Sequence, residues 1–200
     1  MNFDPLETSD IDLFVFPLPK VVLFPSTAQP LNIFEPRYIE MIKDAIKLDR
    51  PIALTNQGRV GGITGVGRPQ ILEERSDGTM MILVRCDCKA RLTSLDQTSK
   101  PYWLATATTI IESTDLDPGN VFYLRRMTNE TIGWLERHIP QPKKRAEFLE
   151  QMGSDEERVN TACSLLIEDS DWLQRLLEMN DLNERLKAAA ALLETGAASH

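Results

Sequence analysis

Residues 61–92 read "GGITGVGRPQILEERSDGTMMILVRCDCKARL", and this stretch decides the class of fold. A dinucleotide-binding turn has the order G-x-G-x-x-G and leads into a helix. Here the order is G-G-x-x-G-x-G, and Pro69 with the apolar residues beyond it favours an extended chain. Glycine inside a strand typically marks a bulge or a close backbone approach. We therefore predict a strand and no nucleotide site, and the chain also lacks the G-x-x-x-x-G-K-[ST] phosphate loop.

Short β-like runs surround this stretch. Asp77-Gly78 lies between two of them and predicts a hairpin turn. Runs of this kind cover residues 13–19, 21–25, 29–34, 51–55, 62–72, 79–85 and 102–112. One helix interrupts them, beginning near Pro36. Its expected apolar face consists of Phe34, Tyr38, Met41, Ile42, Ala45 and Ile46.

After Asp117-Pro118 the apolar period changes to that of helices. Five helical stretches are predicted, and we expect Asp155 and Asp181 to cap the third and the last. Their apolar positions are Val121, Leu124, Thr128, Ile132, Leu135 and Ile139; Phe148, Leu149 and Met152; Val159, Ala162, Cys163, Leu166 and Ile167; Trp172, Leu173, Leu176 and Leu177; and Leu182, Leu186, Ala189, Ala190 and Leu193. We therefore predict a β-rich domain over residues 10–113 and a helical bundle over residues 118–196, joined by "TDLDPGN".

Charge and composition exclude several classes of function. The net charge is −8, and neither half of the chain carries a basic excess. Nucleic acid is therefore not expected as the main partner, and neither is an anionic membrane surface. No apolar run approaches the roughly 20 residues of a membrane-spanning helix. The acidic N-terminus "MNFDPLETSD" does not resemble a targeting signal, so we expect a cytoplasmic protein.

The sequence offers no set of catalytic, cofactor-binding or metal-binding residues. Cys86 and Cys88 form a C-x-C pair, but zinc would need two more ligands, and only Cys163, His138 and His200 remain. The pair alternates with charged residues, which favours buried thiols over a metal or redox site. No H-E-x-x-H or G-x-S-x-G motif occurs. We therefore predict no catalytic residues, no cofactor and no metal.

Three separated blocks resemble the Lon substrate-binding domain, the N-terminal region of ATP-dependent Lon proteases. The first is "FPLPKVVLFPSTAQPLNIFEPRYIEMIKDAI", and the second is the hairpin of residues 60–92 with Asp77 and Gly78 at its turn. The third is "LLEMNDLNERL", which is similar to the family's "LLE-x-x-D-x-x-ERL" signature. One departure is Cys86, which stands where the family usually has glycine, so the close packing there is expected to differ.

The resemblance implies an α+β protein: a β-rich, PUA-like pseudo-barrel followed by an all-α helical bundle. A full Lon protease continues into an ATPase module and a Ser-Lys protease domain, which these 200 residues do not contain. The resemblance thus implies a non-enzymatic module, and the two ends of the chain favour a stand-alone protein. It transfers no catalytic residue, because no family motif in this domain defines one.

The leading functional hypothesis is a binding module for unfolded polypeptide or a protein partner. Such a peptide could add to an exposed strand edge or lie across an apolar groove between the barrel and the helices. Phe34 and Tyr38 could line this groove, although their spacing is more typical of core. The alternative is RNA binding, because PUA domains proper bind RNA. The net charge of −8 argues against RNA binding, because RNA is itself negatively charged.

Overall fold

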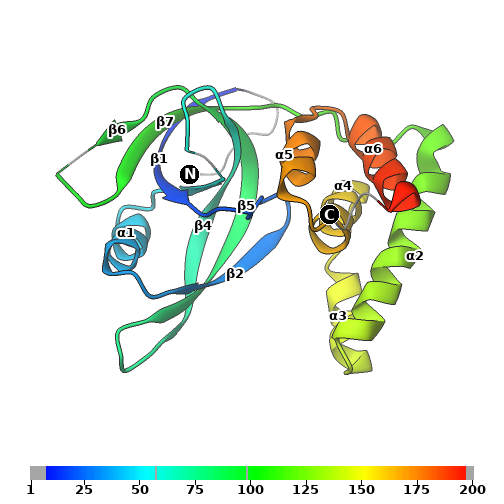
Figure 1. The fold of residues 1–200 in the computed structure, drawn as a ribbon, viewed down its shortest axis with the longest axis horizontal. Helices are drawn as coiled ribbons and strands as arrows, with labels where there is room; N and C mark the ends of the chain where they lie inside the picture. The colour runs from blue at the N-terminus through cyan, green and yellow to red at the C-terminus, as the bar shows by residue number, and fades with distance from the viewer. Residues whose placement is uncertain (1–7, 57, 98, 197–200) are drawn as a thin grey trace. The chain divides into compact units, whose positions relative to one another are not determined.

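The computed structural model describes residues 8–56, 58–97 and 99–196, and the chain divides into two compact units between Ile111 and Glu112 (Figure 1). The first unit contains seven strands and one helix. These are β1 (Asp10–Pro17), β2 (Ala28–Ile33), α1 (Pro36–Lys47), β3 (Ile52–Thr55), β4 (Ile63–Glu74), β5 (Met80–Leu92), β6 (Asp96–Gln97) and β7 (Trp103–Thr109). The strand and helix types agree with the α+β class predicted from the sequence.

The strands close into a barrel because β5 is long enough to serve three neighbours. Its first half pairs with β2, most of its length pairs with β4, and Ala90–Leu92 pair with β7. The ring then runs β5–β4–β3–β1–β7 and returns to β5. Of the strands that the structure describes, β2 and β6 lie outside this ring, each paired on one side with a strand of the barrel. The unit is therefore a closed five-stranded barrel with two flanking strands.

The core of the β-rich unit has two layers because strand side chains alternate between faces. On β1, Leu13 and Val15 pack inside the barrel with Val66 and other small residues. Phe14 and Phe16 point to the other side. There they meet the buried face of α1, formed by Tyr38, Met41, Ile42 and Ala45.

The glycine-rich stretch is a strand, as predicted, and its glycines mark close packing. A Cβ atom at Gly65 would lie 2.0 Å from the carbonyl oxygen of Leu23, and one at Gly67 equally close to that of Arg85. A bulge also falls between Val66 and Gly67. The following turn is the predicted hairpin, since the Gly78 amide donates to the Arg75 carbonyl at 3.0 Å.

The prediction of a strand over residues 21–25 was wrong. Val22, Leu23 and Phe24 are buried but do not belong to a strand, and this loop packs against β4 at Gly65. A buried loop and a buried strand share the same apolar composition, so periodicity could not separate them. The predicted apolar face of the first helix also needs correction, because Phe34 and Ile46 are exposed.

The second unit consists of the short 3-10 helix η1 (Pro118–Asn120) and five helices. These are α2 (Val121–His138), α3 (Pro142–Glu150), α4 (Asp155–Leu166), α5 (Ser170–Glu178) and α6 (Leu182–Thr195). Asp181 caps α6 as predicted, whereas α4 is capped by Ser154 in a capping box, with Asp155 as its first residue. Leu166 and Leu193 are half-buried rather than fully inward, and Leu192 takes the buried place beside Ala189.

One charged cluster in the helical unit was not predicted. Arg185 of α6 is 1% exposed and forms an ion pair with Glu112. It also donates to the Asn160 side chain of α4 at 2.8 Å and to the carbonyls of Leu176 and Met179 at the end of α5, at 2.9 and 2.7 Å. A buried charge needs such partners, and here they join three helices to the first residue of the unit.

The stability of the helical unit depends on its buried apolar faces. Two variants of α6, one at a buried and one at an exposed position, test this. Leu186 is fully buried and Glu184 is exposed on the same helix. Leu186→Ala should lower the free energy of unfolding by about 2–5 kcal/mol, the usual range for truncating a buried leucine. Glu184→Ala should change it by no more than about 0.5 kcal/mol. Urea denaturation measures both, and an unchanged midpoint for Leu186→Ala would contradict this packing.

Candidate functional site

An apolar groove opens in the β-rich unit where β1 ends, β2 ends and α1 begins. Its volume is about 360 Å³. The lining residues come from these three elements and their connections: Phe16, Pro17, Leu18, Pro19, Asn32, Ile33, Phe34, Glu35, Arg37 and Tyr38. Most of these side chains are apolar, so the groove suits an apolar ligand group more than a charged one.

One wall of the groove is the segment that follows β1. The Leu18 amide donates to the Thr55 carbonyl at 3.0 Å, which continues the contact between β1 and β3. The chain then turns, with Lys20 at a φ of 69°. It next enters the buried loop that packs against Gly65. The flanking prolines, Pro17 and Pro19, restrict this wall further, because each fixes its own φ angle.

The floor of the groove is aromatic and rigid. The rings of Phe16 and Tyr38 lie 4.5 Å apart between centroids, and the Arg37 guanidinium lies 4.4 Å from the Tyr38 centroid. Burial raises the pKa of Tyr38 above its ordinary value, so its hydroxyl stays neutral. Arg37 also pairs with Glu35, with Nη2 and Oε2 2.8 Å apart, so the charges at the rim balance each other.

Phe34 is the most distinctive residue of this site. It is 70% exposed, whereas its neighbour Ile33 is 3% exposed and Tyr38 is 8% exposed. The helix begins only at Pro36, with Glu35 as its N-cap in an extended conformation. Phe34 therefore precedes the helix and does not follow its period. The sequence-based expectation that Phe34 and Tyr38 share one buried face was wrong, although both line the groove.

The outer edge of β2 is less suited to binding than the groove. β2 pairs with β5 alone in the described chain, so one of its edges is open to a further strand. Pro30 in its middle has no amide hydrogen to offer, and the Gln29 side chain donates to the Pro30 carbonyl at 3.3 Å. Proline on an edge strand discourages pairing with another chain. The groove at α1, which lies within the β-rich unit, therefore has a better geometry for binding than this strand edge.

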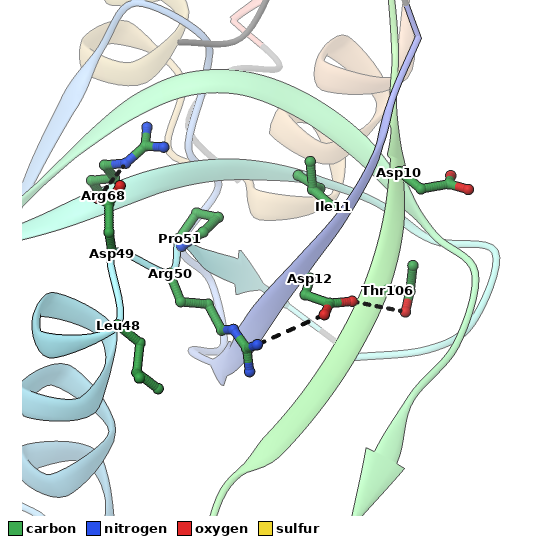
Figure 2. A pocket seen from close by; sticks show the side chains of 9 residues that line it. All are labelled: Asp10, Ile11, Asp12, Leu48, Asp49, Arg50, Pro51, Arg68 and Thr106. Carbon is green, nitrogen blue, oxygen red and sulfur yellow. Dashed lines mark hydrogen bonds and ion pairs between the residues drawn. The ribbon is translucent and has the colours of Figure 1, made fainter. Parts of the chain in front are cut away.

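A second pocket, of about 480 Å³, is polar and lies beside β1 and the end of α1 (Figure 2). Its arginines already hold carboxylates: Arg50 Nη2 lies 3.7 Å from Asp12 Oδ2, and Arg68 Nε lies 3.3 Å from Asp49 Oδ1. With Asp10 also in the lining, the pocket has more acidic than basic groups. Such a surface does not favour a phosphate or another anion.

The described residues contain no group of three or more histidine, cysteine, aspartate or glutamate side chains that could hold a metal ion. Cys86 is buried with its Sγ 3.9 Å from the Leu23 carbonyl oxygen, and Cys88 is half-buried. Burial raises the pKa of Cys163 to about 12, which makes its thiol a poor nucleophile at neutral pH. His138 is stacked on Trp134, with ring centroids 4.0 Å apart. The contacts of the three cysteines and of His138 are thus typical of residues with a structural role.

The sequence did not identify the wall formed by residues 17–19 as part of a site. Pro17-Leu18-Pro19 was assigned to a strand, and its place beside Phe34 depends on contacts between distant segments. The two prolines on either side of Leu18 could have indicated that this segment is not a strand, since a strand interior rarely tolerates proline.

Among the described residues, no helix is both long and apolar enough to cross a membrane.

The closed barrel followed by helices defines a class of fold that is found in solved Lon N-terminal domains. A Lon N-terminal domain protein from Xanthomonas campestris superposes with a TM-score of 0.65 at 19% identity, covering 90% of this chain and 97% of that one. The N-terminal domain of the Mycobacterium avium complex Lon protease gives a TM-score of 0.68 at 13% identity, over 92% and 98% of the two chains. These similarities concern the fold alone.

Residues 12–195 match the substrate-binding domain of ATP-dependent protease La (Lon), and the chain belongs to this family. The Lon proteases of Escherichia coli K12 and Shigella dysenteriae are each 27% identical to it over 206 residues, which cover 96% of this chain. The chain spans about a quarter of the length of these curated relatives. The family resemblance recognised in the sequence is thereby confirmed.

The groove wall depends on the contact between Leu23 and Gly65, which can be tested directly. Gly65→Ala would force a Cβ atom against the Leu23 carbonyl, so we expect it to lower the free energy of unfolding of the β-rich unit by at least about 1–3 kcal/mol. Gly133→Ala is the control, because Gly133 lies in α2 with space around it. That variant should gain up to about 1 kcal/mol from better helix propensity. Urea denaturation showing no loss for Gly65→Ala would contradict the close approach.

Proposed function

We propose that this protein is a non-catalytic module that binds unfolded polypeptide, and that the apolar groove is its binding site. The observation that carries the proposal is Phe34, a large aromatic side chain that is 70% exposed at the rim of a groove with an aromatic floor. Family membership supports it, since the matching region is named as a substrate-binding domain. In this proposal residues 10–113 form the binding domain and residues 118–196 a helical support, in the cytoplasm.

Physical chemistry explains why the groove would prefer unfolded chains. An unfolded chain exposes its apolar side chains, and a pocket of about 360 Å³ has room for at least one of them. The gain on burying a large apolar side chain is about 1.5–3 kcal/mol, so binding at this groove alone would be weak and reversible. Such weak binding suits a module that must accept many sequences and release them. Folded proteins keep most of their large apolar side chains buried, so they would not bind at the groove.

The alternative of RNA binding gains no support from the two pockets. The groove holds one arginine, which is already paired with Glu35, and the second pocket is mainly acidic. A site for a phosphate backbone needs several unpaired cations close together. Catalysis by this chain is likewise not part of the proposal, because the groove presents no nucleophile beside a base. The module would act by binding, and any protease activity would belong to other domains.

Two exposed phenylalanines provide a matched test of this proposal. Phe34 and Phe122 are both 70% exposed, but only Phe34 borders the groove. We expect Phe34→Ser to weaken binding of a reduced and alkylated, permanently unfolded polypeptide at least tenfold, about 1.4 kcal/mol, and Phe122→Ser to leave it unchanged. Fluorescence anisotropy of the labelled polypeptide measures both affinities. Equal affinities for the two variants would refute the groove as the site.

A further inference from the structure

Helix α3 lacks both the buried side chains that the other helices of its unit have and the capping side chain found in α4, α5 and α6. It contributes no buried side chain, and its apolar residues Phe148 and Leu149 are only half-buried. Its N-cap, Gln141, makes no side-chain capping bond. By contrast, α4, α5 and α6 each have a capping side chain and several buried residues. A nine-residue helix with so little support is marginal by itself.

The same region concentrates positive charge in an otherwise acidic unit. Residues 137–145, "RHIPQPKKR", contain four lysines and arginines and no acidic residue. The remainder of residues 112–200 carries 6 lysines and arginines against 17 acidic residues. Three of the four cations lie in the first turn of α3, where the helix dipole makes positive charge unfavourable. This arrangement of charges destabilises α3, so the stability of the helix does not explain why the lysines and arginines are there.

The geometry presents these cations to solvent. The Lys143 side chain is 90% exposed, with its Nζ 3.9 Å from Glu147 Oε1, and such an exposed ion pair is weak. Arg137 and Lys144 are also exposed. Arg145 has a different role, because its Nη1 donates to the carbonyl of Ile139 at 2.8 Å and secures the turn into α3 at the end of α2 (Figure 1). We use the name basic tip for the exposed residues Arg137, Lys143 and Lys144 together with the half-buried Phe148 and Leu149 of α3.

We propose that the basic tip binds an acidic, amphipathic segment of a partner protein. The exposed cations attract carboxylates from a distance, and Phe148 and Leu149 offer apolar contact once the segment has docked. Carboxylates spaced along one face of a helix can meet the cations and avoid Glu136, Glu147 and Glu150, which border the tip. The partner's charge would also relieve the unfavourable positive charge at the start of α3.

Nucleic acid fits the basic tip less well. A continuous phosphate backbone would pass close to the bordering glutamates, and the tip has only three exposed lysines and arginines to neutralise it. It would also leave Phe148 and Leu149 without an apolar partner. This proposal is independent of the apolar groove, because its residues all belong to the helical unit.

The experiment uses the full chain and a fluorescein-labelled 20-residue peptide of glutamate, leucine and alanine with leucines at helical spacing. The double variant Lys143→Glu/Lys144→Glu is compared with Lys47→Glu/Lys187→Glu, which changes the net charge equally at exposed positions elsewhere. We expect the first variant to bind the peptide at least tenfold more weakly and the second to bind it like the parent, with affinity falling as salt rises. Glutamates suit the start of α3, so circular dichroism should show intact helices in both variants.

Three results would overturn the proposal. The first is that both double variants bind the acidic peptide equally well. The second is that the parent protein does not bind the peptide even at low salt. The third is that a 20-nucleotide single-stranded RNA binds the parent more tightly than the acidic peptide does, and loses that affinity in Lys143→Glu/Lys144→Glu.

Discussion

The carbonyl oxygen of Leu23 lies where a side chain at position 65 would have to be, and this contact shapes the β-rich unit. A Cβ atom at Gly65 would lie 2.0 Å from that oxygen, so the loop can pack against β4 only because residue 65 is glycine. The loop follows directly from Pro17–Pro19, one wall of the apolar groove. Its other end leads into β2, which delivers Ile33 and Phe34 to the opposite side. Gly65 thus helps to position the two sides of the groove, although it does not line the groove itself.

In the helical unit the comparable constraint is the charge of Arg185. Its partners on α4, α5 and the first residue of the unit fix how these segments meet. The family signature "LLE-x-x-D-x-x-ERL" acquires a physical meaning here: Asp181 caps α6, and Arg185 holds the carbonyls at the end of α5. Removing one partner of such a cluster leaves a buried charge, which explains why the residues occur together.

Local patterns in the sequence predicted most of the fold. The hairpin at Asp77-Gly78, the strand through the glycines and the cap of α6 at Asp181 follow from short-range chemistry, and these three are present. Two features resisted prediction for different reasons. The loop through Leu23 has the apolar composition of a strand, and only tertiary packing distinguishes the two. Arg185 lies three residues after Leu182 on the buried face, and an arginine is rarely fully buried unless it is paired, so a pattern of apolar residues does not reveal it.

The groove was only partly visible in the sequence. Phe34 and Tyr38 were recognised as possible lining, but their exposures differ because the helix begins between them, at Pro36. Residues 17–19 come from a segment whose approach to β2 and α1 depends on the whole barrel. A site formed by chain segments that are distant in sequence cannot be assembled from periodicity. The functional proposal therefore depends on the fold as much as on family membership.

In the proposed function, unfolded chains contact the protein at Phe34. A photo-reactive benzoyl-phenylalanine at position 34 or at position 122, in the full chain, tests it without requiring any loss of affinity. Both positions are equally exposed, so non-specific collisions should label them equally. We predict that the permanently unfolded polypeptide is cross-linked strongly at position 34 and only at background level at position 122. Equal cross-linking at the two positions, or stronger cross-linking at position 122, would contradict the claim.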